Sequence, residues 1–318
     1  MKSDFENRIE AITSPLPGSV AYTVNYKLSV KLKHEGLTLV ELYTKSFPHI
    51  SKSVWLKKID DGLLTINGKH ANAKTVLKAG WMTENKVHNK TEPSVNVSID
   101  LIYEDESIVV LNKPSPLPMH PSGRFNKNTL TEILKLAYPQ TNFKIVHRLD
   151  ANTTGIIVLA KTTEMAKMIS LQFHNNTIKK EYLALVEGIV KKDSQLIVEK
   201  ISATKTKSGG RNLSENGQIS ETKITVLKRD ENSNLTLLKV EPKQGRTNQI
   251  RLHLASINHP IVGDKGYKNQ TYFENNPLTY PDDTLFLHAY KLKIKLKATD
   301  KQFVAKIPKK FYHKIEIN

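Results

Sequence analysis

Short amphipathic helices and one hairpin dominate the pattern of the first third of the chain. Apolar residues at helical spacing predict a helix over residues 37–43 and a second helix over residues 51–59. A short apolar run then ends at Asn67-Gly68, a dipeptide typical of two-residue hairpin turns. The pattern therefore predicts a helix-helix-hairpin unit, which we assign, with the residues before it, to a first domain over residues 1–87.

The pattern changes after this unit. Residues 88–98 are polar and poor in large apolar side chains, as is typical of a linker, so we expect a second domain over residues 99–318. Strand-like apolar runs dominate that domain, at residues 107–111, 155–160, 181–186, 219–227, 235–240, 285–287 and 290–296.

Helices are fewer in the second domain. Capping and apolar spacing predict them over residues 129–137 and 165–173. A third helix should begin near Thr247, with Ile250 facing the core and Arg251 facing outward. Because strands outnumber helices, the predicted fold class is α+β, with a mostly antiparallel mixed sheet and flanking helices.

Composition narrows the partners and the chemistry. The 318 residues include 48 Lys and Arg against 31 Asp and Glu, and the formal net charge of +17 favours a polyanionic partner. Cysteine is absent, which excludes disulfides, thiolate zinc sites and a cysteine nucleophile. The histidines show no spacing typical of a metal site, so we expect no bound metal.

The sequence shows no membrane or export signal. No apolar run approaches the roughly 18–20 residues of a membrane span, and the start of the chain lacks the apolar core of a secretory signal. We therefore expect a cytoplasmic protein that does not bind membranes. Nothing in the pattern indicates an obligate oligomer, and we expect a monomer.

Two polar segments are the candidates for chemistry. The first, residues 146–154, contains Asp150 and runs directly into a predicted strand, and polar groups at the edge of a rigid sheet are well placed to act on a ligand. In the second, residues 241–251, Gly245 permits a tight turn with Arg246 at its apex. Taken singly, each has an ordinary explanation, with Asp150 as a turn cap and Arg246 in contact with phosphate or solvent.

Together the two segments resemble signatures of the RluA-type pseudouridine synthases. The run from His147 to Gly155, HRLDANTTG, is similar to the family's HRLDxxTSG, and the run from Gly245 to His253, GRTNQIRLH, is similar to its GRTHQIRxH. Three shorter segments are similar to further motifs of the family and follow in the expected order, namely Asn112-Lys113-Pro114 with His120-Pro121, Lys180 to Gly188, and Leu287-His288-Ala289. The resemblance covers nearly all of residues 100–318.

The resemblance implies RNA pseudouridine synthase activity. In this reaction the uridine N1–C1′ bond breaks and the uracil is rejoined through C5, without a metal or a redox cofactor. One Asp is essential in the family, and Asp150 occupies its position; covalent attack and abstraction of a sugar proton both stay open as its role. The resemblance makes Tyr182 the residue that stacks on the uracil and removes the C5 proton, and Arg246 the salt-bridge partner of Asp150.

The other matched residues are assigned to substrate binding. Arg148 would fill the gap left by the flipped nucleotide or contact the RNA backbone, and Ile250 would form an apolar wall of the pocket. The substrate-binding set also includes His147, Lys113 and Arg251. Two positions depart from the family pattern, because Asn248 stands where His is usual and Thr154 where Ser is usual, and both keep a hydrogen-bonding side chain.

The first domain resembles an S4 RNA-binding module, in which two helices and a hairpin present basic residues to RNA. The similar segments are Ser51-Lys52-Ser53, Ile66 to Lys69, and Leu77 to Gly80, while Lys52 and Trp81 depart from the usual Arg and Asp. We therefore expect RNA as the partner, with ribosomal RNA the first candidate and transfer RNA the second. A helical cap without RNA contacts is the alternative for this domain.

Two other functions fit part of the sequence. A non-catalytic RNA-binding protein acting in ribosome assembly would share the charge and the fold, but would have no need of Asp150, Tyr182 and Arg246 together. A carboxylate-dependent glycosidase fits less well, because such enzymes use two carboxylates and the signature holds one.

Overall fold

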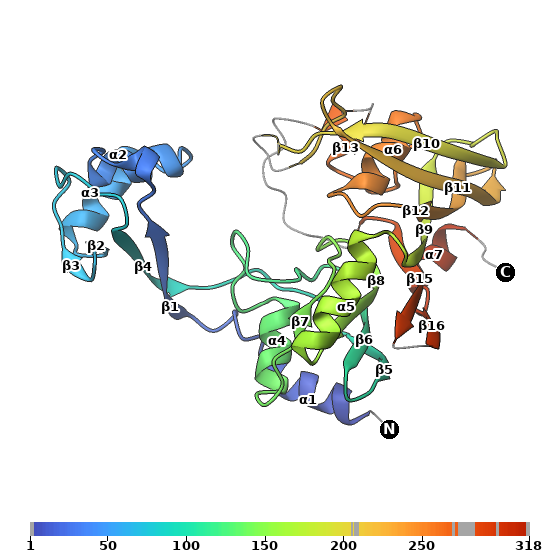
Figure 1. Ribbon diagram of the computed structural model, residues 1–318, viewed down its shortest axis with the longest axis horizontal. Coiled ribbons are helices and arrows are strands. Elements are labelled where there is room, and N and C mark those ends of the chain that lie inside the picture. The colour runs from blue at the N-terminus through green and yellow to red at the C-terminus, as the bar shows by residue number, and fades with distance from the viewer. Residues whose placement is uncertain are drawn as a thin grey trace. The chain divides into compact units, whose positions relative to one another are not determined.

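The structure is a computed structural model that describes residues 3–204, 206, 210–268, 271–272, 284–296 and 299–315. Two compact units divide it (Figure 1). Gly18–Glu92 form the small unit, and residues on both sides of that segment form the large unit. The small unit is thus an insertion into the large one, which differs from the expected first domain over 1–87 and linker over 88–98.

Helix α1 (Asp4–Thr13) explains why the start of the chain belongs to the large unit. Ser3 and Glu6 form a capping box that begins the helix. Phe5 and Ile9 are both buried in an apolar cluster that includes residues of α4 (Leu130–Ala137), and the Phe5 ring stacks on Tyr138 with centroids 6.0 Å apart. The helix therefore covers an apolar surface of the large unit before the chain enters the small one.

The predicted helices and hairpin of the small unit are confirmed. They are α2 (Leu39–Ser46), α3 (Lys52–Asp60), β2 (Leu64–Ile66) and β3 (Lys69–His70), with a short 3-10 helix, η1 (Leu32–His34), before them. Asn67 and Gly68 both have positive φ, 48° and 75°, as this two-residue turn requires. Tyr43 and Trp55 pack with ring centroids 4.8 Å apart in the core beneath.

Two long strands of the small unit were not predicted. They are β1 (Tyr22–Ser29) and β4 (Met82–Lys90), and they complete a sheet of order β1-β4-β2-β3. Inward-facing residues of β1 are only half-buried, so the alternation along it is a weak signal. β4 continues through Lys90, so part of the expected linker over 88–98 is strand.

One mixed sheet is the framework of the large unit. Its order is β10-β11-β12-β9-β15-β8-β6-β5, with β16 beside β15 and β7 beside β8. Its strands are β5 (Asp100–Glu104), β6 (Ile108–Lys113), β7 (Lys144–Ile145), β8 (Thr154–Ala160), β9 (Lys179–Glu187), β10 (Ser194–Ile201), β11 (Gln218–Asp230), β12 (Leu235–Pro242), β15 (Leu287–Leu296) and β16 (Thr299–Val304). Among the described residues β15 pairs with β8 in parallel and the other neighbours are antiparallel, which confirms the predicted α+β class.

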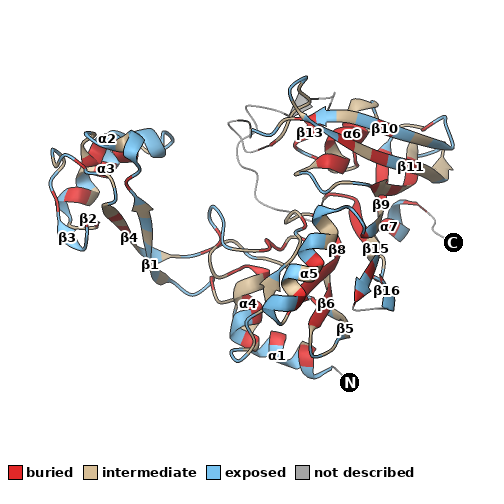
Figure 2. Ribbon diagram, viewed as in Figure 1, coloured by how far each residue is buried: buried red, intermediate tan, exposed pale blue. Residues whose placement is uncertain are grey.

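Helices and a small hairpin complete the large unit. They are α4, α5 (Thr163–His174), α6 (Gln249–Ser256), α7 (Lys309–Lys314), β13 (Tyr267–Lys268) and β14 (Thr271–Tyr272). The three predicted helices of this unit, α4, α5 and α6, are confirmed. Strand β8 is buried along its whole length (Figure 2), so the loop that precedes it is attached to a fully buried strand of the sheet.

A single strand, β15, covers 287–296, so it includes the strand predicted over 290–296 and only the last residue of the run predicted over 285–287. Its register against β9 shifts between Ala289 and Lys291, which marks a bulge. An extra residue at a bulge interrupts the alternation of apolar and polar positions, and this interruption made the strand look like two. β10, an edge strand that exposes Leu196 and Val198, was not predicted.

Candidate active site

A row of paired residues brings the Asp150 loop close to Tyr182. Gly155 at the start of β8 pairs with Ala289 of β15, and Ala289 pairs with Tyr182 of β9. Gly155 has a φ of 113°, and a Cβ on it would lie 2.2 Å from the Ala289 carbonyl oxygen, so only glycine permits this approach. Since neighbouring strands lie about 4.8 Å apart, the row places the end of the Asp150 loop roughly 10 Å from the Tyr182 backbone.

His147 anchors the start of the Asp150 loop. Its Nε2 accepts a hydrogen bond of 2.9 Å from the Val158 N–H of β8, and its ring stacks on Phe173 with centroids 4.5 Å apart. Burial, and then the charge of Lys180, lower the pKa of His147 to about 3, so the ring is neutral and acts as an acceptor. The ring thus ties the start of the loop to β8 and α5, and the predicted substrate contact of His147 stays a prediction.

Lys113 anchors the other side of the loop. Its side chain is fully buried, and Nζ donates to the carbonyl oxygens of Pro114, Leu117 and Ala151 at 2.9, 3.0 and 3.1 Å. A buried ammonium is stable only with such partners. Lys113 thus holds the residue after Asp150 in place, and its predicted contact with the substrate stays a prediction.

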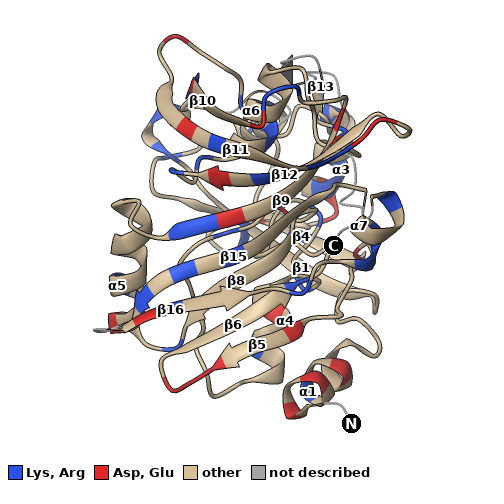
Figure 3. Cartoon of the chain, turned by 90° about the vertical axis from the view of Figure 1, so that its right-hand side faces the viewer, with Lys and Arg blue, Asp and Glu red and all other residues tan. Residues whose placement is uncertain are grey.

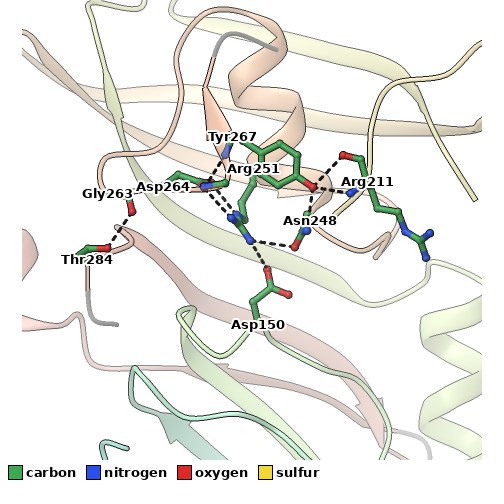
Figure 4. A network of polar contacts seen from close by, with 9 residues as sticks. Asp150, Arg211, Asn248, Arg251, Gly263, Asp264, Tyr267 and Thr284 are labelled. Atoms are coloured by element: carbon green, nitrogen blue, oxygen red, sulfur yellow. Dashed lines mark hydrogen bonds and ion pairs between the residues drawn. The ribbon is translucent and has the colours of Figure 1, made fainter. Parts of the chain in front are cut away.

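Asp150 forms its ion pair with Arg251 (Figure 4). Its Oδ2 lies 3.5 Å from Arg251 Nη1, and 38% of its side chain remains exposed and open to a ligand. Arg251 comes from α6, where the sequence suggested that it faces outward, whereas only 17% of its side chain is exposed. That expectation is wrong because a buried partner draws the guanidinium inward.

The buried partner is Asp264, whose carboxylate is fully buried. Arg251 Nε and Nη2 donate to Asp264 Oδ2 and Oδ1 at 2.7 Å each, and Oδ1 also accepts from the N–H groups of Gly266 and Tyr267. Burial by itself would lower the pKa of Arg251, but the hydrogen bonds and charge of Asp264, with the charge of Asp150, outweigh it and raise that pKa. Arg251 is thus a fixed, permanent cation behind Asp150.

Arg246 does not take the place that the sequence assigned to it. It lies at the exposed turn before α6, and only its backbone is engaged, with Gln249 at 3.1 Å. Within the described part of the chain, no residue bonds to its guanidinium, nor to that of Arg148, which is also exposed. The pairing of Asp150 with Arg246 is therefore corrected to Arg251, while contacts of Arg246 and Arg148 with RNA stay predictions.

Tyr182 lies between two apolar clusters, and Ile250, 7% exposed, belongs to one of them. Burial, and then the negative charge of Asp150, raise the pKa of Tyr182 well above its usual value. The phenol is therefore protonated at neutral pH, and the charge of the Asp150 carboxylate acts on it. This environment suits an aromatic ring that stacks on a base.

Lys180 was matched only as the first residue of a motif and was given no role, and Asp264 and Tyr267 were not singled out by the sequence analysis. Lys180 Nζ donates to the carbonyl oxygens of Gln244 and Lys243 at 2.9 and 3.3 Å, which ties the turn before α6 to β9. Burial lowers the pKa of Lys180 to about 8. Local pattern gave no sign of these roles, because the partners of Lys180 and Asp264 that matter here, the turn before α6 and Arg251, lie on other segments of the chain.

Two features are absent from the described residues. Their His, Asp and Glu side chains form no group of three or more that could hold a metal ion. None of the helices in the described ranges is long and apolar enough to cross a membrane.

Sequence comparison identifies relatives of the chain. Residues 107–256 match a family model described as RNA pseudouridylate synthase. An uncharacterized RNA pseudouridine synthase of Aquifex aeolicus is 34% identical over 254 residues, which is 76% of this chain and 79% of the relative. The ribosomal large subunit pseudouridine synthase C of Vibrio parahaemolyticus is 32% identical over 264 residues, or 79% and 82% of the two chains.

A third relative, the mitochondrial tRNA pseudouridine(32) synthase of Saccharomyces cerevisiae, is 31% identical over 273 residues, 83% of this chain and 58% of the relative. Among solved structures, human RNA Pseudouridylate Synthase Domain Containing 4 superposes with a TM-score of 0.55 at 26% identity, covering 68% of this chain and 91% of the other. The fold, the motifs and the relatives agree, and the chain belongs to the RNA pseudouridine synthases, a family of isomerases.

Proposed function

We propose that the protein isomerises uridine to pseudouridine within structured RNA, with Asp150 as the essential carboxylate. The observation that carries the proposal is the half-exposed Asp150 carboxylate, held against the buried Arg251 cation on a loop fixed by Lys113. The ionised carboxylate is the form that attacks C1′ or takes a sugar proton. Either route ends with a C5–C1′ bond, loss of the C5 proton and gain of a proton at N1.

Tyr182 is the proposed partner of Asp150 in this reaction. Its ring would stack on the uracil after the nucleotide leaves the RNA stack, which is necessary because the glycosidic bond is inaccessible in stacked RNA. Because its pKa is raised, the phenol can accept the C5 proton only while passing its own proton to an acceptor. The negative charge of Asp150 contributes to the raised pKa of the phenol, and we assign Asp150 as the acceptor of the phenol proton.

Replacing Tyr182 with Phe tests this assignment. Tyr182→Phe should lower single-turnover pseudouridine formation by about 10²–10⁴-fold, the usual contribution of a general acid–base group. RNA affinity should change little because the stacking ring remains. Tyr103→Phe is the matched control, since its hydroxyl bonds Asp105 between β5 and β6. Wild-type turnover in Tyr182→Phe would exclude the hydroxyl from proton transfer.

We propose ribosomal RNA as the substrate, with transfer RNA as the alternative. The net charge of +17 suits either polyanion, and Figure 3 shows Lys and Arg positions, in blue, on strands such as β9 and β15. Relatives named for large-subunit ribosomal RNA and for tRNA support both classes.

Comparing pseudouridine maps of RNA from wild-type and deletion strains tests the function and identifies the substrate together. Loss of one or more sites is the expected result, restored by the wild-type gene and not by one encoding Asp150→Asn. If every site persists in the deletion strain, the catalytic proposal fails and a non-catalytic RNA-binding role replaces it.

The small unit, Gly18–Glu92, is the proposed S4-like RNA-binding module. Its support is the order of helices α2 and α3 with the β2–β3 hairpin, and the exposed lysines on these elements, including Lys52, Lys57 and Lys69.

Excising the insertion tests the role of the small unit. The Gly18 carbonyl accepts from the Glu92 N–H at 2.8 Å, so a short Gly-Ser linker can join residues 17 and 93. This deletion keeps α1 and should leave a folded large unit with RNA affinity about tenfold or more weaker, measured by filter binding. Truncating residues 1–98 instead should also lower the melting temperature, because it uncovers the surface under Phe5 and Ile9. Unchanged affinity and site choice after excision would exclude an RNA-binding role.

A further inference from the structure

Asn248 sits at the junction between the α6 turn and the catalytic pair. It is the N-cap of α6 and has φ 59° and ψ 18°, in the left-handed region. Among residues with a Cβ, Asn, Asp and His adopt this conformation most readily. The backbone therefore restricts the position to glycine or to a few polar side chains.

The side chain of Asn248 accepts a hydrogen bond from one N–H group of Arg251. A guanidinium has five N–H donors, of which Nε and Nη2 use one each on Asp264. Nη1 donates to Asn248 Oδ1 at 3.2 Å and lies 3.5 Å from Asp150 Oδ2. Because Asn248 accepts one of the two Nη1 hydrogens, the other is directed toward Asp150 (Figure 4).

The orientation of the amide is determined by its two neighbours. A guanidinium only donates, so the amide oxygen must face Arg251 and the amide nitrogen must face the Tyr267 hydroxyl, which it meets at 3.0 Å. That hydroxyl accepts from the Arg211 N–H at 2.9 Å and donates to the Arg211 carbonyl at 3.1 Å. The buried Tyr267 ring also lies under the guanidinium, with Cζ of Arg251 4.9 Å from its centroid.

We propose that Asn248 is a positioning residue, which sets the rotation of the Arg251 guanidinium so that Nη1 faces Asp150. The role rests on the proposed function, since it concerns the same catalytic carboxylate. The positioning role requires a side chain at 248 that accepts from Arg251 and donates to Tyr267. A neutral imidazole also has one acceptor and one donor, so Asn and His satisfy the same two neighbours.

Three substitutions that tolerate the left-handed backbone test the proposal. Asn248→Gly removes the amide and should lower kcat about 10–100-fold with KM for RNA within about threefold, because a small misplacement of a catalytic group costs rate more than binding. Asn248→His keeps the donor and the acceptor and should stay within about threefold of wild type. Asn248→Asp loses the donor and adds a carboxylate that competes for Nη1, so its kcat should fall at least as far as that of Asn248→Gly.

Two kinetic outcomes would contradict the positioning role of Asn248. Wild-type kcat in Asn248→Gly, or a rise in KM alone, would overturn the proposal, because Arg251 would then be positioned without the amide. An Asn248→His protein as impaired as Asn248→Gly would overturn it as well, since the paired donor and acceptor would not be what matters.

A second readout needs no turnover. The chain has seven arginines, so selective ¹⁵N labelling gives few guanidinium signals, and Arg251→Lys identifies those of Arg251. In the wild type the two Nη1 hydrogens are expected to give separate signals, because one is bonded to Asn248 and the other faces Asp150. In Asn248→Gly these two signals should average, while the Nε and Nη2 groups stay held by Asp264. If the wild type makes no pseudouridine yet shows this difference, the proposed function fails and the positioning role stands. If Asn248→Gly leaves the resonances separate, the positioning role fails.

Discussion

Asp150→Asn is expected to reduce pseudouridine formation by at least about 10⁴-fold, as loss of the reacting group does in covalent or general-base catalysis. The amide has the shape of the carboxylate but neither attacks C1′ nor accepts a proton. RNA affinity should stay within about threefold of wild type, because the loop is held by Lys113 and His147 and not by the carboxylate. Single-turnover assays and filter binding on the mapped RNA measure the two effects.

The matched control for this variant is Asp105→Asn. Asp105 has a similar side-chain exposure, 35% against 38% for Asp150, and also faces a cation, Lys301. Asp105 lies between β5 and β6, before the first residue of β6. Asp150 lies near the other end of β6, where Lys113 pairs with Gly155 of β8. Loss of the Asp105 carboxylate should therefore not change turnover. Turnover by Asp150→Asn within tenfold of wild type would contradict the assignment of the essential carboxylate.

Asp264→Asn should produce the second largest effect, on stability and turnover together. The substitution leaves the buried Arg251 without its bidentate carboxylate, and breaking a buried ion pair from one side costs about 3–5 kcal/mol. Turnover should fall about 100-fold even at temperatures where the variant is fully folded, because the guanidinium is no longer held against Asp150. Thermal unfolding and single-turnover rates at low temperature separate the two losses.

Arg246 provides the comparison for this prediction. Its guanidinium is exposed, so Arg246→Ala should leave the melting temperature unchanged, and any loss should be found mainly in RNA affinity. If Arg246→Ala abolished turnover while Asp264→Asn had little effect, the Asp150–Arg251 pair seen in the structure would not be the functional pair.

Much of the fold was predictable because it depends on neighbours along the chain. The hairpin at Asn67-Gly68 follows from a turn that needs positive φ at both positions. The buried strand β8 follows from an unbroken apolar run, and α4 from capping and apolar spacing. Where a local irregularity interrupted the pattern, as at the bulge beside Ala289, prediction from local pattern was wrong.

The candidate site was predictable only in part. Motif resemblance selected Asp150 and Tyr182, and the strand pairing through Ala289 places the segments that carry them close together. It also assigned substrate contacts to Lys113 and His147, whose side chains the structure engages in holding the loop. A motif indicates that a residue matters, but not whether its side chain faces a ligand or the protein interior.

By itself, then, the sequence determined the elements, the family resemblance and the candidate carboxylate. Only the tertiary structure decided which arginine meets that carboxylate. A charge enters the interior only where a partner compensates its loss of water, and the partner of Arg251 is Asp264, on the segment that follows α6. That compensation exists only once the loop before β8, helix α6 and the segment after it have come together, so no pattern along the chain could reveal it.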